Sequence, residues 1–142
     1  GGSREPATTE SVAAGRHTLV MADGPQVYFS AVEGMVDTGR KLLAALDLSW
    51  DEVALVVPHQ PNARLLTRLA RVAGFSPEKL YSNVERLGNT SGAACPIALD
   101  EALASGRLEP GDKVVLITAG AGYTAGAALL QVDEALLASF AR

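Results

Sequence analysis

The sequence predicts a single α/β domain in which helices cover both faces of a sheet. Residues 53–57 form an apolar, β-branched run that is too short for a buried helix and is typical of an interior strand. Along the chain, such runs alternate with longer stretches of helical spacing, in the order strand, helix, strand, helix, short strand, helix, strand, strand. A length of 142 residues is enough for one domain with a substantial core.

The first third of the chain is expected to hold an arm, a strand and a long helix. Residues 1–16 are rich in Gly, Ser, Thr and Glu and predict a loop or arm. Residues 17–21 are a short strand candidate, ended by a turn signal at residues 23–24 (Asp-Gly). Over residues 26–46 apolar side chains recur three and four positions apart, which predicts an amphipathic helix.

The middle of the chain is expected to surround a strand with turns and a helix. Residues 49–52 (Ser-Trp-Asp-Glu) have the form of a capping box and predict a single turn. A helix is expected over residues 61–72, because a proline is tolerated in a first turn, and Gly74 is expected to stop it. Residues 76–79 predict another turn, and residues 80–84 could form a short strand.

The last part of the chain is expected to add a helix, two strands and a terminal helix. The helix is expected over residues 97–104 and the first strand over residues 113–118. Residues 119–122 (Ala-Gly-Ala-Gly) should break that strand, which resumes over residues 123–132. Residues 133–142 are typical of a short terminal helix.

Composition excludes several classes of protein. The net charge of −4 gives no general electrostatic reason to bind nucleic acid, and no apolar run is long enough to span a membrane. The single cysteine, Cys95, excludes an internal disulfide and fits a reducing, cytoplasmic location. The two histidines, His17 and His59, have no companions at metal-ligand spacing, so we expect no metal site.

Three loops each lie where a strand ends or a helix begins, at residues 59–62, 88–91 and 120–122. In open α/β sheets this edge is where ligands bind. A neutral imidazole (His59) and a carboxamide (Asn89), aimed at one thioester carbonyl, would form an oxyanion hole for an enolate. The glycine-containing turn exposes backbone N–H groups for a second oxyanion.

Each loop also has a simpler interpretation. His59 could merely cap a strand–helix turn, residues 88–89 could be an ordinary turn, and residues 120–122 could be a hairpin bend. On the residues alone, the ordinary turn and the hairpin bend are the favoured interpretations.

A family resemblance adds to this. Residues 59–62 (His-Gln-Pro-Asn) resemble the His-Gln-Ala-Asn motif of the β-ketoacyl-acyl-carrier-protein synthase III family. Residues 88–91 (Gly-Asn-Thr-Ser) are similar to its Gly-Asn-Thr-Ser motif, and residues 120–124 resemble its C-terminal glycine loop. The resemblance runs from about residue 17 to residue 132, with three motifs in family order.

The resemblance implies the C-terminal half of a thiolase-like fold, a layered α-β-α sheet over residues 17–132, with the arm 1–16 before it and the tail 133–142 after it. Gly1 falls in a loop after the place of the first strand, so we expect that strand to be missing from this chain. The implied partners are the N-terminal portion of the same enzyme, as a separate chain or cleaved segment, and an acyl carrier protein. The complete protomer is expected to form a homodimer, with no nucleic acid or membrane partner.

In that family a cysteine nucleophile takes the acyl group, and a His–Asn pair binds a malonyl thioester for decarboxylative condensation. His59 and Asn89 match the pair, and the backbone N–H of Ala121 matches the acyl oxyanion hole within the pocket loop that contains Gly120 and Gly122. The implied activity is thioester Claisen condensation in fatty-acid or polyketide biosynthesis. It uses acyl-CoA and phosphopantetheinyl carrier protein as substrates, and no tightly bound cofactor. It requires the absent N-terminal portion, which carries the nucleophilic cysteine.

Three arginines, Arg64, Arg68 and Arg71, follow at helical spacing on one face of the helix after His59. Arg64 matches a carrier-protein-contacting arginine of the family. For Arg68 and Arg71 two interpretations are equally good: contact with carrier protein or CoA, and a solvated helix face.

Some residues depart from the family pattern. Ala119 stands where the family often has Phe, and Phe29 stands where a basic, carrier-facing residue is common. Cys95 lies where the family has small apolar residues, and we interpret it as a packing residue rather than the nucleophile. Two alternatives stay open: an acyltransferase of the same fold that forms an ester or amide, with His59 as general base, and a non-catalytic scaffolding subunit.

Overall fold

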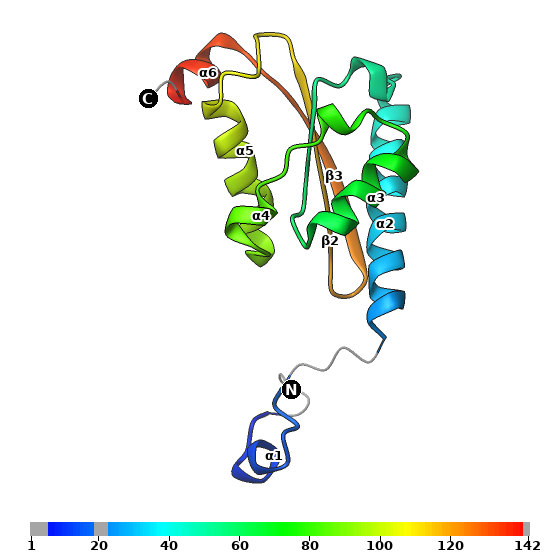
Figure 1. Ribbon diagram of the computed structural model, residues 1–142, viewed down its shortest axis with the longest axis vertical. Helices are drawn as coiled ribbons and strands as arrows, with labels where there is room; N and C mark the ends of the chain where they lie inside the picture. The colour runs from blue at the N-terminus through cyan, green and yellow to red at the C-terminus, as the bar shows by residue number, and fades with distance from the viewer. Residues whose placement is uncertain (1–5, 19–22, 141–142) are drawn as a thin grey trace.

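The structure is a computed structural model that describes residues 6–18 and 23–140. It contains three layers, with helices on both sides of a small sheet, as Figure 1 shows. This arrangement agrees with the layered α/β class that the sequence predicts. The helices of the outer layers are α2 (Gly24–Ala45) and α3 (Ala63–Ala73) on one face, and α5 (Ala94–Ala104) and α6 (Glu134–Phe140) on the other.

The sheet has three strands in the order β1 (Leu55–Pro58), β2 (Lys113–Gly120) and β3 (Thr124–Gln131). β1 runs parallel to β2, and β2 runs antiparallel to β3. An isolated parallel bridge joins Val56 to Leu80 on the other side of β1. Since all four residues of β1 are buried, the prediction of a strand covered on both faces is confirmed.

Successive residues of β1 point to opposite faces of the sheet and enter two separate cores. Val56 packs into a cluster with residues of α2 and α3, including Met35 and Leu69. Val57 packs into the cluster on the other face, with residues that include Ala98 of α5. Both valines are fully buried, and each such burial contributes about 1.5–3 kcal/mol to stability.

The turn before β1 is the capping box that the sequence predicts. The backbone N–H and the hydroxyl of Ser49 both donate to Oε2 of Glu52, at 2.8 and 3.0 Å, around the 3₁₀ turn η1 (Trp50–Glu52). The N–H of Val53 donates to the carbonyl of Trp50 and so still belongs to this turn. The strand therefore begins two residues later than predicted.

The arm over residues 1–16 is not simply a loop, because its described part contains the short helix α1 (Thr9–Ala13). The N–H of Ser11 donates to the hydroxyl of Thr8 at 3.1 Å, and the N–H of Thr8 donates to the hydroxyl of Ser11 at 2.8 Å. Serine and threonine indicated a loop in the sequence, but the same hydroxyls cap this helix.

The strand predicted over residues 17–21 does not form in its described part, where His17 lies in a turn and Thr18 in a bend. The last three residues of that stretch lie outside the described residues. Asp23 lies directly before α2. Its side chain accepts a hydrogen bond from the N–H of Gln26 at 2.9 Å and caps α2, so a turn signal proved to be a helix cap.

Helix α3 begins later than the predicted residues 61–72, because Asn62 caps it. The side chain of Asn62 accepts a hydrogen bond from the N–H of Leu65 at 2.9 Å, which places Pro61 before the cap and outside the first turn. The predicted stop at Gly74 is confirmed, since this residue has a left-handed φ of 90°.

The short strand considered for residues 80–84 is reduced to the single bridge at Leu80. It follows the predicted turn, which is the 3₁₀ helix η2 (Pro77–Lys79). The end of the stretch belongs instead to a short helix, α4 (Val84–Leu87). This helix leads directly into the loop that carries Asn89.

The C-terminal elements form in the predicted order, with shifted boundaries. The break predicted at residues 119–122 is shorter, because Ala119 and Gly120 still pair with β3. Helix α5 begins three residues earlier than predicted, at Ala94, since a proline fits in a first turn. The terminal helix α6 is confirmed, and Asp133 accepts a hydrogen bond from a backbone N–H of its first turn at 2.7 Å.

Candidate functional site

The three loops singled out in the sequence meet in one pocket of about 370 Å³. They meet because the parallel strands β1 and β2 end at the same edge of the sheet, and the Asn89 loop returns to that edge. Of the predicted site residues, the pocket brings together the side chains of His59 and Asn89 with Gly120 and Ala121 of the glycine turn. Its lining is His59, Asn89, Ser91, Gly92, Thr118, Ala119, Gly120 and Ala121.

His59 stands directly after β1. Its backbone N–H donates to the carbonyl of Ile117 at 2.8 Å and extends the parallel ladder by one residue. The side chain is half-buried, and burial lowers the pKa of its imidazole below the ordinary 6.5. The imidazole is therefore neutral at pH 7, the state in which it can donate one hydrogen bond and accept another.

Asn89 has a defined orientation. Its Oδ1 accepts a hydrogen bond from the N–H of Ser91 at 2.9 Å, and an N–H donor requires an oxygen in that place. The Nδ2 amide is therefore the atom of this side chain that can donate to another group. Gly88, with φ 67°, directs the chain from α4 into this loop. Asn89 is exposed to solvent.

The turn between β2 and β3 requires glycine at position 122. Gly122 has a φ of 144°, and a Cβ there would lie 2.7 Å from Oγ1 of Thr124. Ala121 and Gly120 line the pocket, whereas Gly122 does not. Gly122 therefore shapes the turn that presents Ala121 to the pocket.

Three further residues line the pocket without being among the predicted site residues: Ser91, Gly92 and Thr118. Ser91 has an unusual positive φ of 57°, which no sequence pattern signals. Thr118 is identifiable in principle, because it lies near the end of a strand predicted to reach the same edge of the sheet.

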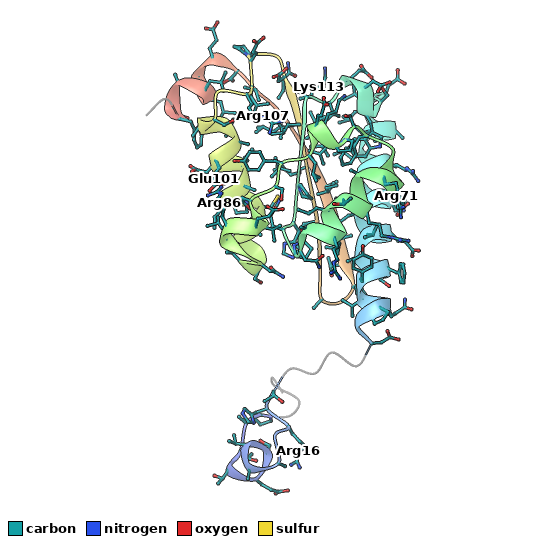
Figure 2. The ribbon with its side chains drawn as sticks, in the orientation of Figure 1. Arg16, Arg71, Arg86, Glu101, Arg107 and Lys113 are labelled. Atoms are coloured by element: carbon teal, nitrogen blue, oxygen red, sulfur yellow. The ribbon has the colours of Figure 1, made fainter. Side chains whose placement is uncertain are left out.

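The three arginines of α3 do not line this pocket. Arg64 and Arg71 are exposed, and Figure 2 shows Arg71 on the outer side of α3. Arg68 does not lie on a merely solvated face. Its guanidinium carbon lies 4.7 Å from the ring centroid of Phe29 and 5.9 Å from that of Tyr28, and its Nε is buried without a hydrogen-bond partner. Arg68 therefore rests on an aromatic surface of α2.

Cys95 packs on the face of the sheet that α5 covers. Its thiol donates to the carbonyl of Val57 at 3.4 Å, and burial raises the thiol pKa. The side chain lines a second, apolar pocket of about 390 Å³ between α5 and the strands β2 and β3. These properties agree with a packing role, because a nucleophilic thiolate needs the opposite pKa shift.

Within residues 6–18 and 23–140, no three His, Cys, Asp or Glu side chains gather where they could hold a metal ion. In the same part of the chain, no helix combines the length and the apolar character that crossing a membrane demands.

Comparison with known proteins identifies the family. The model of the 3-oxoacyl-[acyl-carrier-protein] synthase III C-terminal region matches residues 43–132. A β-ketoacyl-[acyl-carrier-protein] synthase III of Symbiobacterium thermophilum is 42% identical over 131 residues, which are 92% of this chain and 39% of that protein.

Solved structures agree with this. The 3-oxoacyl-(acyl carrier protein) synthase III of Pseudomonas aeruginosa superposes with a TM-score of 0.81 at 31% identity, over 92% of this chain and 40% of that one. The priming β-ketosynthase of the R1128 polyketide pathway superposes with a TM-score of 0.74, also at 31% identity, over 82% of this chain and 35% of that one.

The chain spans about two fifths of the length of these relatives, 39% and 40% in the first two. The predicted resemblance, including its restriction to a C-terminal portion, is confirmed. The chain belongs to the 3-oxoacyl-[acyl-carrier-protein] synthase III family and carries the C-terminal part of its thiolase-like fold.

Proposed function

We propose that this chain is the C-terminal part of a ketoacyl synthase III-type acyltransferase. In this proposal His59 and Asn89 bind the thioester carbonyl of a malonyl-type extender. The observation that carries it is the pocket in which these two side chains meet the glycine turn. Membership of the family supports the reaction class, and the polyketide ketosynthase among the solved relatives supports fatty-acid or polyketide assembly as the setting.

The two side chains suit the charge that decarboxylation creates. Loss of carbon dioxide from a malonyl thioester leaves an electron pair on the α-carbon, which is delocalised onto the thioester oxygen. Two neutral donors, an imidazole N–H of His59 and Nδ2 of Asn89, would stabilise that oxyanion. The lowered pKa of His59 favours the neutral ring, and the bond from Ser91 N–H leaves Nδ2 as the donor of Asn89.

The α-carbon would then attack the carbonyl carbon of an acyl group held as a thioester on a cysteine. A carbon–carbon bond forms, and the resulting tetrahedral oxyanion accepts a hydrogen bond from the backbone N–H of Ala121. The cysteine thiolate then leaves as the ketoacyl product is released. Cys95 is not that cysteine, because its pKa is raised and its thiol contacts the carbonyl of Val57.

The nucleophile is therefore assigned to the remaining portion of the protein, for which the greater length of the relatives leaves room. Activity would require that N-terminal portion, whether it belongs to the same polypeptide or to a separate chain. We propose that the complete protomer forms a homodimer.

The arginines of α3 are proposed to contact an acyl carrier protein or the phosphates of CoA. The helix has three arginines and no acidic residue in a chain whose net charge is −4. Among the described residues, neither Arg64 nor Arg71 forms an ion pair, so their charges are available to an acidic partner.

One observation favours a second candidate, acyl transfer to a hydroxyl or amine without decarboxylation. Ala119 lines the pocket at the position where the family often has Phe, which widens the site, and a neutral His59 could act as general base. A scaffolding subunit without activity is the third candidate.

One assay separates the three. The complete protein, containing this chain and its N-terminal portion, is incubated with acyl-CoA, carboxyl-labelled malonyl carrier protein and a hydroxyl or amine acceptor. Condensation releases labelled carbon dioxide and a 3-ketoacyl product. We expect His59→Ala to lower kcat about 10²–10³-fold, the typical effect of removing one oxyanion donor. Ester or amide product without carbon dioxide would establish the second candidate, and activity unaffected by His59→Ala would establish the third.

A further inference from the structure

The residue that directly follows His59 in the chain has a buried polar side chain. Gln60 is fully buried, and both ends of its carboxamide are bonded. Its Nε2 donates to the carbonyls of Pro58 at 3.1 Å and Tyr81 at 3.0 Å, and its Oε1 accepts from the backbone N–H of Asn83 at 3.2 Å. The residue next to His59 is therefore tied to the segment that precedes α4.

A single carboxylate oxygen receives the next three hydrogen bonds. Oε2 of Glu101, on α5, accepts from Nη2 of Arg86 at 2.7 Å, Nδ2 of Asn83 at 3.0 Å and the hydroxyl of Tyr81 at 3.3 Å. Figure 2 shows Glu101 and Arg86 close together on the side of α4 and α5. The side chain of Glu101 is only 26% exposed, and Asn83 is 3% exposed.

These hydrogen bonds join the segments that come before and after the loop that carries Asn89. Asn83 is the N-cap residue of α4, Arg86 lies within α4, and the chain then passes through Gly88 and Asn89 into α5, which carries Glu101. Glu101 thus joins the helix before the loop to the helix after it. Through Asn83 the same network extends to Gln60, the residue beside His59.

We propose that Glu101 is a positioning residue, which acts through Asn83 and Gln60 to set the carboxamide of Asn89 against the imidazole of His59. This inference rests on the proposed function, since it concerns the same site. A surface ion pair with Arg86 alone would contribute little, because the Arg86 side chain is 63% exposed. The bond to Asn83 is different, because loss of its acceptor leaves a buried amide unsatisfied.

Glu101→Gln is the informative variant. It conserves the size of the side chain but removes its negative charge, so a carboxamide oxygen in the place of Oε2 accepts the same three hydrogen bonds more weakly than the carboxylate does. We expect the kcat of condensation to fall about 10- to 100-fold, since a displacement of about 1 Å at a catalytic group has effects of that size. The KM for acyl-CoA should stay within about twofold.

A double-mutant cycle with Asn89→Ala distinguishes positioning from a general structural role. If Glu101 acts by placing Asn89, Glu101→Gln should have little further effect once the carboxamide of Asn89 is absent. A purely structural role would lower kcat by the same factor in both backgrounds, and that result would overturn the proposal. Glu85→Gln is the matched control: Glu85 lies on α4 and accepts from the hydroxyl of Ser82, and its kcat should equal that of the wild type.

A second variant keeps the test decisive if Glu101→Gln fails to fold. Arg86→Met removes only the bond on the exposed side of Glu101, and we expect a smaller decrease in kcat with the same non-additivity toward Asn89→Ala. Wild-type protein without condensation activity would overturn the proposed function. Wild-type activity that neither Glu101→Gln nor Arg86→Met lowers would overturn this inference alone.

Discussion

The backbone N–H of His59 donates to the carbonyl of Ile117 at 2.8 Å, across the parallel strands β1 and β2. This hydrogen bond is the last one between β1 and β2, so the imidazole stands where β1 ends and β2 continues alone toward the glycine turn. Thr118 and Ala119, which follow Ile117, line the same pocket as His59. One backbone hydrogen bond therefore positions a candidate catalytic side chain against the strand that leads into the glycine turn.

Asn89→Asp should abolish most of the decarboxylation while leaving the loop folded. An aspartate can still accept the hydrogen bond from Ser91 N–H, but it replaces the Nδ2 donor with a negative charge facing an oxyanion. We expect release of labelled carbon dioxide to fall by at least about 10²-fold.

Asn62→Asp is the matched control for that variant. Asn62 accepts a backbone N–H at the same 2.9 Å distance, and aspartate caps a helix as well as asparagine does. We expect it to leave the rate within about twofold, because its role is the same in either form. Equal losses in the two variants would argue against a donor role for Asn89.

The pH–rate profile should have an acid limb with its midpoint below 6.5, because burial lowers the pKa of His59 from that value. Protonation keeps the single N–H donor of the neutral imidazole, but it places a positive charge in a half-buried site and removes the lone pair needed by a general base. Loss of the acid limb in His59→Ala would assign the limb to this residue.

The same shift affects stability, and its sign follows from linkage. As the pH falls, the unfolded chain binds a proton at His59 near pH 6.5, before the folded chain does. The contribution of the neutral His59 to the free energy of unfolding is therefore fully present above that pH and is lost as the pH falls through the lowered pKa. Between pH 7.5 and pH 5, wild-type protein should therefore lose more unfolding free energy than His59→Gln. Parallel losses in both proteins would show that burial of this imidazole is not coupled to folding.

Gly122→Ala should destabilise the hairpin. A side chain at a φ of 144° is strained, and its Cβ would lie 2.7 Å from Oγ1 of Thr124, so we expect a loss of about 1–3 kcal/mol in urea unfolding. Gly120→Ala is the comparison, because a Cβ there meets nothing within 4 Å and glycine within a strand is itself unfavourable. An equal loss in the two variants would contradict the steric argument.

Arg64→Ala should raise the KM for an acidic carrier protein about tenfold and weaken its salt dependence, with a smaller effect on reactions in which free CoA thioesters are the only substrates. Lys41→Ala is the control, since Lys41 is an exposed cation on α2 that already pairs with Asp37 at 2.6 Å. If the two variants raise the KM equally, binding of the carrier protein depends on net charge rather than on a specific contact with α3.

Short-range patterns in the sequence predicted much of the fold. The capping box at Ser49 and Glu52, the stop at Gly74 and the long helix α2 all depend on residues within a few positions of one another. The failures have local causes as well. Asp23 and Asn62 are residues equally suited to turns and to helix caps, and the neighbouring glycine and proline do not decide between the two.

The candidate site could be predicted as three motifs, because each lies at an identifiable end of a strand or helix. The Glu101 network could not, since Gln60 and Asn83 are 23 residues apart and Asn83 and Glu101 are 18 residues apart. Each looks like an ordinary polar residue until the chain folds.

The sequence by itself therefore determined the family, the helices with strong amphipathic spacing, and the residue types of the site. Only the tertiary structure decided that β1 lies beside β2, that Arg68 rests on Phe29, and that one oxygen of Glu101 accepts from three donors. The physical reason is that these contacts join residues far apart in the chain, and burial decides which of their possible hydrogen bonds must form.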